Sequence, residues 1–277
     1  MKMSVLVCLL LIGSANVSLT AQDQSQVTTW KYPISVAASA DAIYVADRQL
    51  PGIWLVKDGK AEVYFQADKK IGSVLNAVRC LAFDQSGHLV VGDSATRDVY
   101  RFDEQRVPHA LTDGKIGIPM GIAVAKDGSL FVSDLELKQI VRILVDSKDI
   151  EVVANVTAPT GLALAANGDV LVVCRAKDPV RRVTTAGEVS VVVSGIPFGF
   201  AQDIAVDSEG KIFVTDGYAK AIFSVTPGEA PTKLLAGNPL VHPVGICRNG
   251  DVMLVVDPRA KKLFRLVDNK LESVLRE

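Results

Sequence analysis

The sequence predicts an all-β protein, specifically a six-bladed β-propeller of four-stranded antiparallel blades, and three observations lead to this prediction. A unit of roughly forty residues recurs six times along the 277-residue chain. Each copy alternates short runs rich in β-branched residues with turn residues. An apolar residue always follows the end of the second run by six positions. The residues that end the second run are Asp47, Asp93, Asp134, Cys174, Asp216 and Asp257.

The clearest copy occupies residues 119–143 and shows what each element is. Residues 122–124 form a first apolar strand, and Lys126-Asp127-Gly128 is a turn signal. A second strand follows at 130–133, a third at 139–143 and a fourth at 150–153. No window outside the first 21 residues has a helical period, so strands account for the whole repeat.

The first and second strands are apolar at nearly every position, which indicates burial on both faces. One four-stranded sheet cannot cover both of its own faces. Radial stacking of six such sheets does, and this predicts one propeller domain over residues 33–277.

The motif at 119–124 and 159–164, Pro-x-Gly-[Ile/Leu]-Ala-[Val/Leu], is followed by Asp-x-Gly and a strand that ends in Asp. This pattern resembles the NHL repeat of six-bladed propellers of the NHL/SMP-30 type, in the TolB-like propeller superfamily. Proteins of that shape include binding scaffolds, sensor domains, lactonases and lyases, so the resemblance implies the fold and leaves the activity open. Three copies depart from it, because Ser35, Cys80 and Asp203 stand where the motif has glycine.

The first 21 residues predict a secretory signal peptide. Lys2 begins it, residues 5–12 are apolar, and small and polar residues lead to a cleavage site after Ala21. We therefore expect a secreted or periplasmic protein with no membrane attachment after cleavage. Residues 22–32 form a polar segment before the repeats, and residues 27–30 are a candidate for an extra strand.

The charge and the cysteine content limit the classes of partner and ligand that we expect. The formal net charge is -1 and no basic run is present, so we expect no nucleic-acid partner. Cys80, Cys174 and Cys247 lie in apolar strands with no metal-ligand spacing, which favours small buried side chains over a bridge or ligand role. We expect no cofactor and no bound metal, and a monomer.

In a propeller, the loops that lead into the first strands and those that leave the second strands meet at one mouth of the central channel. Six polar residues fall on these loops and form the candidate ligand site, which would take a small molecule or a protein partner. Arg79 and Asp203 come from opposite blades, and two interpretations stay open: they face one another across the channel, or each serves the fold by bonding channel carbonyls or water. The six residues are Asn76, Arg79, Arg175, Gln202, Asp203 and His242.

Residues 195–201 carry Phe198 and Phe200 into the fifth copy. Two interpretations stay open for these rings: they cover the gap between two blades, or they form an apolar wall over the channel.

The five repeated aspartates, Asp47, Asp93, Asp134, Asp216 and Asp257, are interpreted as structural. Each is expected to accept backbone N–H groups of the loop that follows it. The alternative, a ring of carboxylates around a cation, is disfavoured because one carboxylate per blade does not converge on one ion.

The sequence therefore favours an exported binding or scaffold module over an enzyme. The alternative is a metal-dependent hydrolase similar to SMP-30 or gluconolactonase. That resemblance implies a Glu, an Asn and an Asp at the starts of blades, where this chain has Ile34, Thr160 and only Gln202-Asp203. Such a site would be degenerate.

Overall fold

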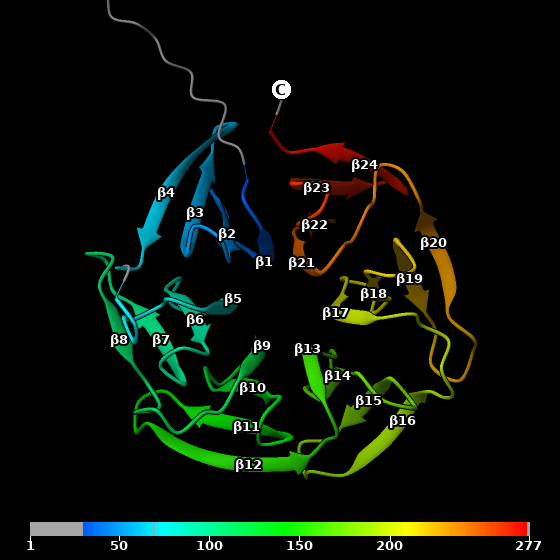
Figure 1. Ribbon diagram of the computed structural model, residues 1–277. Helices are drawn as coiled ribbons and strands as arrows, with labels where there is room; N and C mark the ends of the chain where they lie inside the picture. The colour runs from blue at the N-terminus through cyan, green and yellow to red at the C-terminus, as the bar shows by residue number, and fades with distance from the viewer. Residues whose placement is uncertain (1–29, 69, 276–277) are drawn as a thin grey trace, which may run out of the picture.

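A computed structural model describes residues 30–68 and 70–275. The proposed signal peptide, residues 22–29 and therefore the first three residues of the candidate strand at 27–30 lie outside them. The described residues form six four-stranded antiparallel sheets around a central axis, so the predicted all-β, six-bladed propeller is confirmed (Figure 1). None of the described residues lies in a helix. No helix in this part of the chain is therefore long and apolar enough to cross a membrane.

Each blade uses four consecutive strands, so no strand is exchanged between blades. Blades 1 to 3 consist of β1 (Pro33–Ala38), β2 (Ile43–Asp47), β3 (Gly52–Lys57), β4 (Lys60–Gln66), β5 (Val78–Phe83), β6 (Leu89–Asp93), β7 (Asp98–Phe102), β8 (Pro108–Ala110), β9 (Pro119–Val124), β10 (Leu130–Asp134), β11 (Gln139–Leu144) and β12 (Asp149–Asn155). Blades 4 to 6 consist of β13 (Pro159–Leu164), β14 (Val170–Cys174), β15 (Val180–Val183), β16 (Val189–Val193), β17 (Ala201–Val206), β18 (Ile212–Asp216), β19 (Ala221–Val225), β20 (Thr232–Ala236), β21 (Gly245–Asn249), β22 (Val252–Asp257), β23 (Lys262–Val267) and β24 (Lys270–Ser273).

The first strand of every blade lies beside the axis and the fourth forms the rim (Figure 1). Burial follows this order: all five residues of β10 are buried, whereas most of β12 is partly or fully exposed. Six apolar clusters fill the spaces between neighbouring blades, as between blades 4 and 5 around Phe198, Val214 and Phe223. Each sheet therefore packs against its two neighbours, which buries both of its faces as the apolar first and second strands predict.

The third residue of each motif forms a layer around the axis, which we call the ring layer: Ser35, Cys80, Gly121, Gly161, Asp203 and Gly245. A Cβ at the three glycines would come within 3.0 Å of backbone atoms of the next blade. The other three bind that blade instead. Ser35 Oγ accepts Leu81 N–H at 3.2 Å, Cys80 Sγ lies 3.7 Å from the Pro119 carbonyl, and Asp203 Oδ2 accepts Ile246 N–H at 3.0 Å. The departures from glycine thus replace a close backbone approach by a side-chain bond.

The seam between blades 6 and 1 joins the two ends of the described chain. Trp30, which is 4% exposed, packs edge-on against Trp54 with ring centroids 5.9 Å apart. The same apolar cluster includes Val36 of blade 1 and Leu254 and Val256 of blade 6. Among the described residues no sheet spans this seam, so side-chain packing closes the ring there.

The three cysteines among the described residues, Cys80, Cys174 and Cys247, are free thiols. Cys80 and Cys174 are buried and Cys247 is partly exposed to the channel. Burial raises the pKa of Cys174 to about 11 and raises the pKa of the other two as well. Thiols of this kind are poor nucleophiles, which agrees with a packing role.

Candidate functional site

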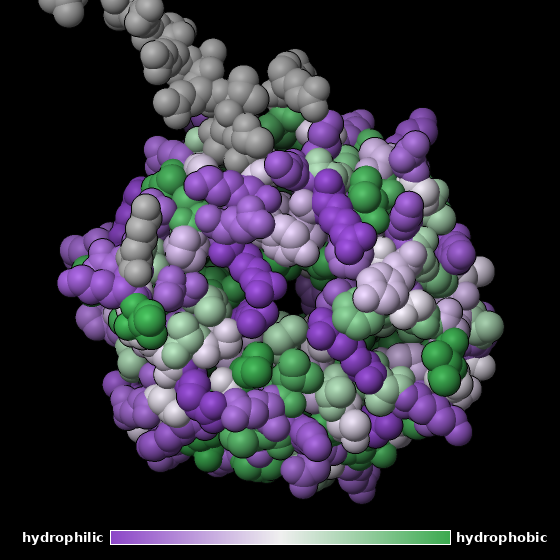
Figure 2. All heavy atoms as spheres, viewed as in Figure 1, coloured by the Kyte–Doolittle hydropathy of each residue, from purple (hydrophilic) through white to green (hydrophobic). Residues whose placement is uncertain are grey.

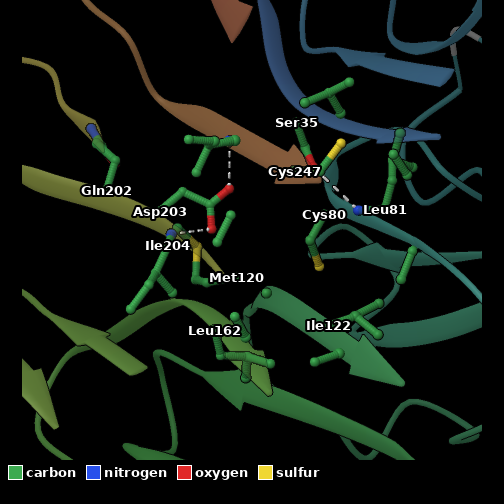
Figure 3. Close-up of a pocket in the computed structure, with 18 of the residues that line it drawn as sticks. Ser35, Cys80, Leu81, Met120, Ile122, Leu162, Gln202, Asp203, Ile204 and Cys247 are labelled. Atoms are coloured by element: carbon green, nitrogen blue, oxygen red, sulfur yellow. Dashed lines mark hydrogen bonds between the residues drawn. The ribbon is translucent and has the colours of Figure 1, made fainter. Parts of the chain in front are cut away.

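A cavity of about 580 Å³ runs along the axis and is lined by the first strands of all six blades. The space-filling view shows a hollow at the centre of the disc with strongly hydrophilic residues on both sides of it (Figure 2). Its inner wall is apolar, with Met120, Leu162 and Ile204 beside Asp203 and the thiols (Figure 3). The channel therefore combines an apolar interior with polar groups at the loops.

The structure brings five of the six candidate residues together in the lining of this cavity: Arg79, Arg175, Gln202, Asp203 and His242. Asn76 does not line it. Arg48 and Tyr32 line it as well and were not among the candidates. Arg48 follows the second strand of blade 1, as Arg175 follows that of blade 4, so their shared repeat position is the signal that points to Arg48.

Arg48, Arg79 and Arg175 come from blades 1, 2 and 4 and give the mouth a positive charge. Burial lowers the pKa of Arg79, and the positive charge of Arg48 lowers it further. Burial likewise lowers the pKa of Arg175, with a further lowering by Arg79. The three cations therefore lie close enough to repel one another, and an anion between them would relieve this repulsion.

The arginines at the mouth are held by neutral groups. Arg79 Nε donates to Ser94 Oγ at 2.9 Å, and Ser94 Oγ lies 3.2 Å from the Ala77 carbonyl. Arg175 Nη2 donates to Gln202 Oε1 at 2.5 Å. The ion pairs of the described residues include none of Arg48, Arg79 and Arg175. The orientations of Arg79 and Arg175 are thus fixed without neutralising their charge.

Each of the two interpretations of residues 195–201 applies to one phenylalanine: Phe198 covers the gap between two blades, and Phe200 lies at the mouth. Phe198 is 7% exposed and packs edge-on against Phe223, in the space between blades 4 and 5. Phe200 lies at the mouth, where the Arg175 guanidinium carbon is 4.5 Å above its ring centroid. On its other contact, Phe200 stacks on Tyr218 at 4.7 Å and 19°. Tyr218 was not a candidate, because its place at the mouth depends on this stacking.

His242 is 7% exposed and lines the cavity. Its ring lies against Gly217, where a Cβ would come within 2.7 Å of Nδ1. Nδ1 is buried and has no hydrogen-bond partner among the described residues. Buried polar atoms are rarely unpaired in folded proteins, so this nitrogen is a candidate for a functional role.

Asp203 does not face Arg79 as an ion-pair partner, which differs from the first interpretation and agrees with the second, a role in the fold. Its Oδ1 accepts the N–H of Ile204 at 2.9 Å and its Oδ2 accepts the N–H of Ile246, so it connects blade 5 to blade 6 (Figure 3). The difference arises because a side chain in the ring layer meets the next blade before it can cross the channel. Burial raises the pKa of Asp203 to about 7, and its two N–H donors lower it only in part.

The five repeated aspartates make more bonds than the sequence predicts. Each accepts the N–H groups of the residues two and three positions later. Each also accepts two N–H groups from the loop that precedes its own blade, 15 to 18 residues earlier. One carboxylate therefore ties together the two loops that form the mouth in that blade.

Divalent cations are held by about six oxygen ligands with carboxylates supplying the charge. Asp203 is the one carboxylate that lines the cavity, and both of its oxygens already accept backbone N–H groups. The described residues contain no group of three or more His, Cys, Asp or Glu side chains that could hold a metal ion. The donor set therefore does not fit the divalent cation of the SMP-30 type.

Comparison with known proteins gives the fold alone. No family model matches the chain, and no curated protein matches it. Among solved structures, a gluconolactonase from Xanthomonas campestris is similar, with 15% identity, a TM-score of 0.72, and 88% of this chain and 87% of that chain covered. A catalytically inactive variant of virginiamycin B lyase from Staphylococcus aureus, with quinupristin, has 17% identity and a TM-score of 0.68, with 89% of this chain and 85% of that chain covered. A chain of a nidogen–laminin complex has 16% identity and a TM-score of 0.68, over 88% and 93%. At such identities the likeness establishes a six-bladed propeller similar to gluconolactonases and lyases.

Proposed function

We propose that this propeller is a binding module for a small anionic ligand, which it holds at the mouth of the central channel. The observation that carries the proposal is the convergence of Arg48, Arg79 and Arg175 from three blades onto one cavity, with no ion pair to any of them among the described residues. Guanidinium groups are preferred for carboxylate and phosphate recognition because they present parallel N–H donors.

Calorimetric titration with a series of small carboxylates, from acetate to benzoate, tests this function. Arg79→Gln and Arg175→Gln should each weaken binding by about tenfold or more, as expected for a charge-assisted hydrogen bond of about 1.5–3 kcal/mol. Arg265→Gln, an exposed arginine on β23 outside the cavity, is the matched control and should bind as the wild type does. Binding that is absent in the wild type, or equal in all three variants, contradicts the proposal.

The alternative is a metal-dependent hydrolase, which the gluconolactonase neighbour supports by its name. The donor set at the channel argues against it. Lactone hydrolysis by purified protein, measured with and without added Ca²⁺ or Zn²⁺, should stay at the uncatalysed rate. Metal-dependent turnover together with one tightly bound ion per chain would favour the hydrolase.

We also propose export and a monomeric state, both from the sequence. Mass spectrometry of the protein from its native source should give a chain that begins at Gln22, and a chain that retains Met1 contradicts export. Size-exclusion chromatography with light scattering should give the mass of one chain.

A further inference from the structure

We propose that the ligand carries a planar aromatic ring beside its anionic group, because the mouth presents a ring-binding shelf next to the arginines. This inference rests on the proposed function and names the class of ligand. The shelf consists of Phe200, Tyr218 and His242, with Arg175 at one end.

The rings of the shelf follow one another across the mouth. The guanidinium of Arg175 lies 4.5 Å above Phe200, Phe200 stacks on Tyr218 at 4.7 Å, and Tyr218 is 5.8 Å from the tilted ring of His242. Tyr218 is nevertheless 65% exposed. A large aromatic side chain that is held by stacking and still faces solvent is a ready contact surface for another ring.

A single carboxylate holds the two stacked rings of the shelf, Phe200 and Tyr218, in place. Asp216 Oδ1 accepts the N–H groups of Phe200, Tyr218 and Ala219, at 2.9, 3.0 and 2.9 Å. Its Oδ2 accepts the N–H of Gly199. Both loops that carry the stacked rings are therefore fixed to the same group, so a ligand meets a preorganised surface and binding requires little ordering of side chains.

His242 gives the shelf a directional polar group. Its backbone N–H donates to Asp257 Oδ2 at 2.7 Å, and its ring is fixed against Gly217. Nδ1 is buried and has no hydrogen-bond partner among the described residues. The imidazole is thus an unpaired polar ring next to Tyr218.

These groups together select a particular chemistry. The arginines take an anionic oxygen, and the exposed Tyr218 takes the face of a ring joined to it. A saturated ring of the same size fills the same space but lacks the π-face, so aromatic stacking adds affinity beyond the area that is buried.

Two matched pairs of acids test this inference: benzoate with cyclohexanecarboxylate, and 3-phenylpropionate with 3-cyclohexylpropionate. We expect the wild type to bind at least one aromatic acid roughly three- to tenfold more tightly than its saturated partner, since stacking contributes about 0.5–1.5 kcal/mol. Tyr218→Leu, which keeps apolar area without a ring, should bring this ratio close to one. Tyr218→Phe should restore it, and Val107→Ala, in an exposed turn between β7 and β8, should leave it unchanged.

The outcomes separate this inference from the function on which it rests. Equal binding of both members of each pair by the wild type overturns the aromatic shelf and leaves the anion site standing. A preference that persists in Tyr218→Leu, with wild-type thermal stability, also overturns the shelf. Failure of all four acids to bind overturns both the shelf and the anion site.

Discussion

At the scale of the residue, one buried aspartate connects chain segments that are distant in sequence. Asp134 accepts N–H groups from Glu136 and Leu137 of its own loop and from Gly117 and Ile118 of the loop that leads into the blade. Blade 4 has Cys174 at this position, and its loop at 175–178 consists of bends, whereas the other blades form turns there. The carboxylate therefore shapes both loops at the mouth.

Replacement of Asp134 by alanine should lower the free energy of unfolding by about 3 kcal/mol, because four N–H groups lose their acceptor in a mostly buried setting. Urea denaturation followed by circular dichroism measures this loss. Asp146→Ala, at an exposed aspartate of the same blade, is the control and should stay within about 0.5 kcal/mol of the wild type. Equal stabilities of the two variants would show that the carboxylate is dispensable to the fold.

Asp203 makes stability depend on pH. Because burial raises its pKa from 3.8 to about 7 in the folded state, the protonated form is favoured by folding. This contribution is fully present below the unfolded pKa and is lost as pH rises through the folded pKa. The free energy of unfolding should therefore fall between about pH 4 and pH 7, by up to about 1.4 kcal/mol per pH unit.

Asp203→Asn has no titrating proton at this position, so the free energy of unfolding of this variant should change less with pH between about pH 4 and pH 7. Urea denaturation of both proteins at about pH 5 and about pH 8 measures how much stability each one loses as the pH rises. The wild type should lose more than the variant. An identical pH response in the two proteins would mean that Asp203 is ionised throughout.

The residues show how far the sequence predicts the site. The repeat positions place Arg79, Arg175, Gln202, Asp203 and His242 at the channel, because the spacing of loops in a propeller determines which of them meet. The repeat does not predict what each side chain then contacts. Asp203 binds a neighbouring blade and Tyr218 stacks on Phe200, and both outcomes depend on distances between blades that the chain order does not contain.

At the scale of the element, the first strands approach each other most closely in the ring layer. A Cβ at Gly161 would lie 2.5 Å from the Cα of Asp203, a backbone atom that can give way only if β17 moves. The sequence predicts the six blades and their strand order well, since both follow from local patterns. The sequence also shows that Ser35, Cys80 and Asp203 replace glycine, but it does not show that each of these side chains bonds to the next blade.

Gly161→Ala should therefore destabilise the protein by about 1–3 kcal/mol, as overpacking of a close contact does. Gly199→Ala is a suitable comparison, because the nearest side-chain atom to the new Cβ is the Tyr218 Cβ at 3.3 Å. The midpoint temperature of thermal unfolding should fall further for Gly161→Ala than for Gly199→Ala. If the order is reversed, the blades can separate at the axis at little cost, and the ring layer does not set their spacing.

At the scale of the whole molecule, the ring closes between blades 6 and 1, where the described residues contain neither a linking segment nor an exchanged strand. The chain passes directly from each of the other blades to the next, so this seam depends most on packing. Trp30 fills it from just before the first strand, in contact with Trp54 and in the same apolar cluster as Leu254 and Val256 of blade 6. The stability of the complete disc should accordingly be sensitive to one side chain outside the repeats.

Trp30→Ala should lower the free energy of unfolding by about 3–5 kcal/mol, the usual cost of truncating a buried tryptophan. Trp30→Phe keeps most of the volume and should recover more than half of the loss. Trp30 and Trp54 are the only tryptophans of the chain, so Trp54 alone reports on the seam in both variants. Its fluorescence should shift to the red at a lower urea concentration than in the wild type, because the seam opens to water when the disc unfolds. If Trp30→Ala leaves both the fluorescence and the circular dichroism transitions at their wild-type midpoints, Trp30 does not close the ring, and the packing of β1 against β21 alone holds the seam.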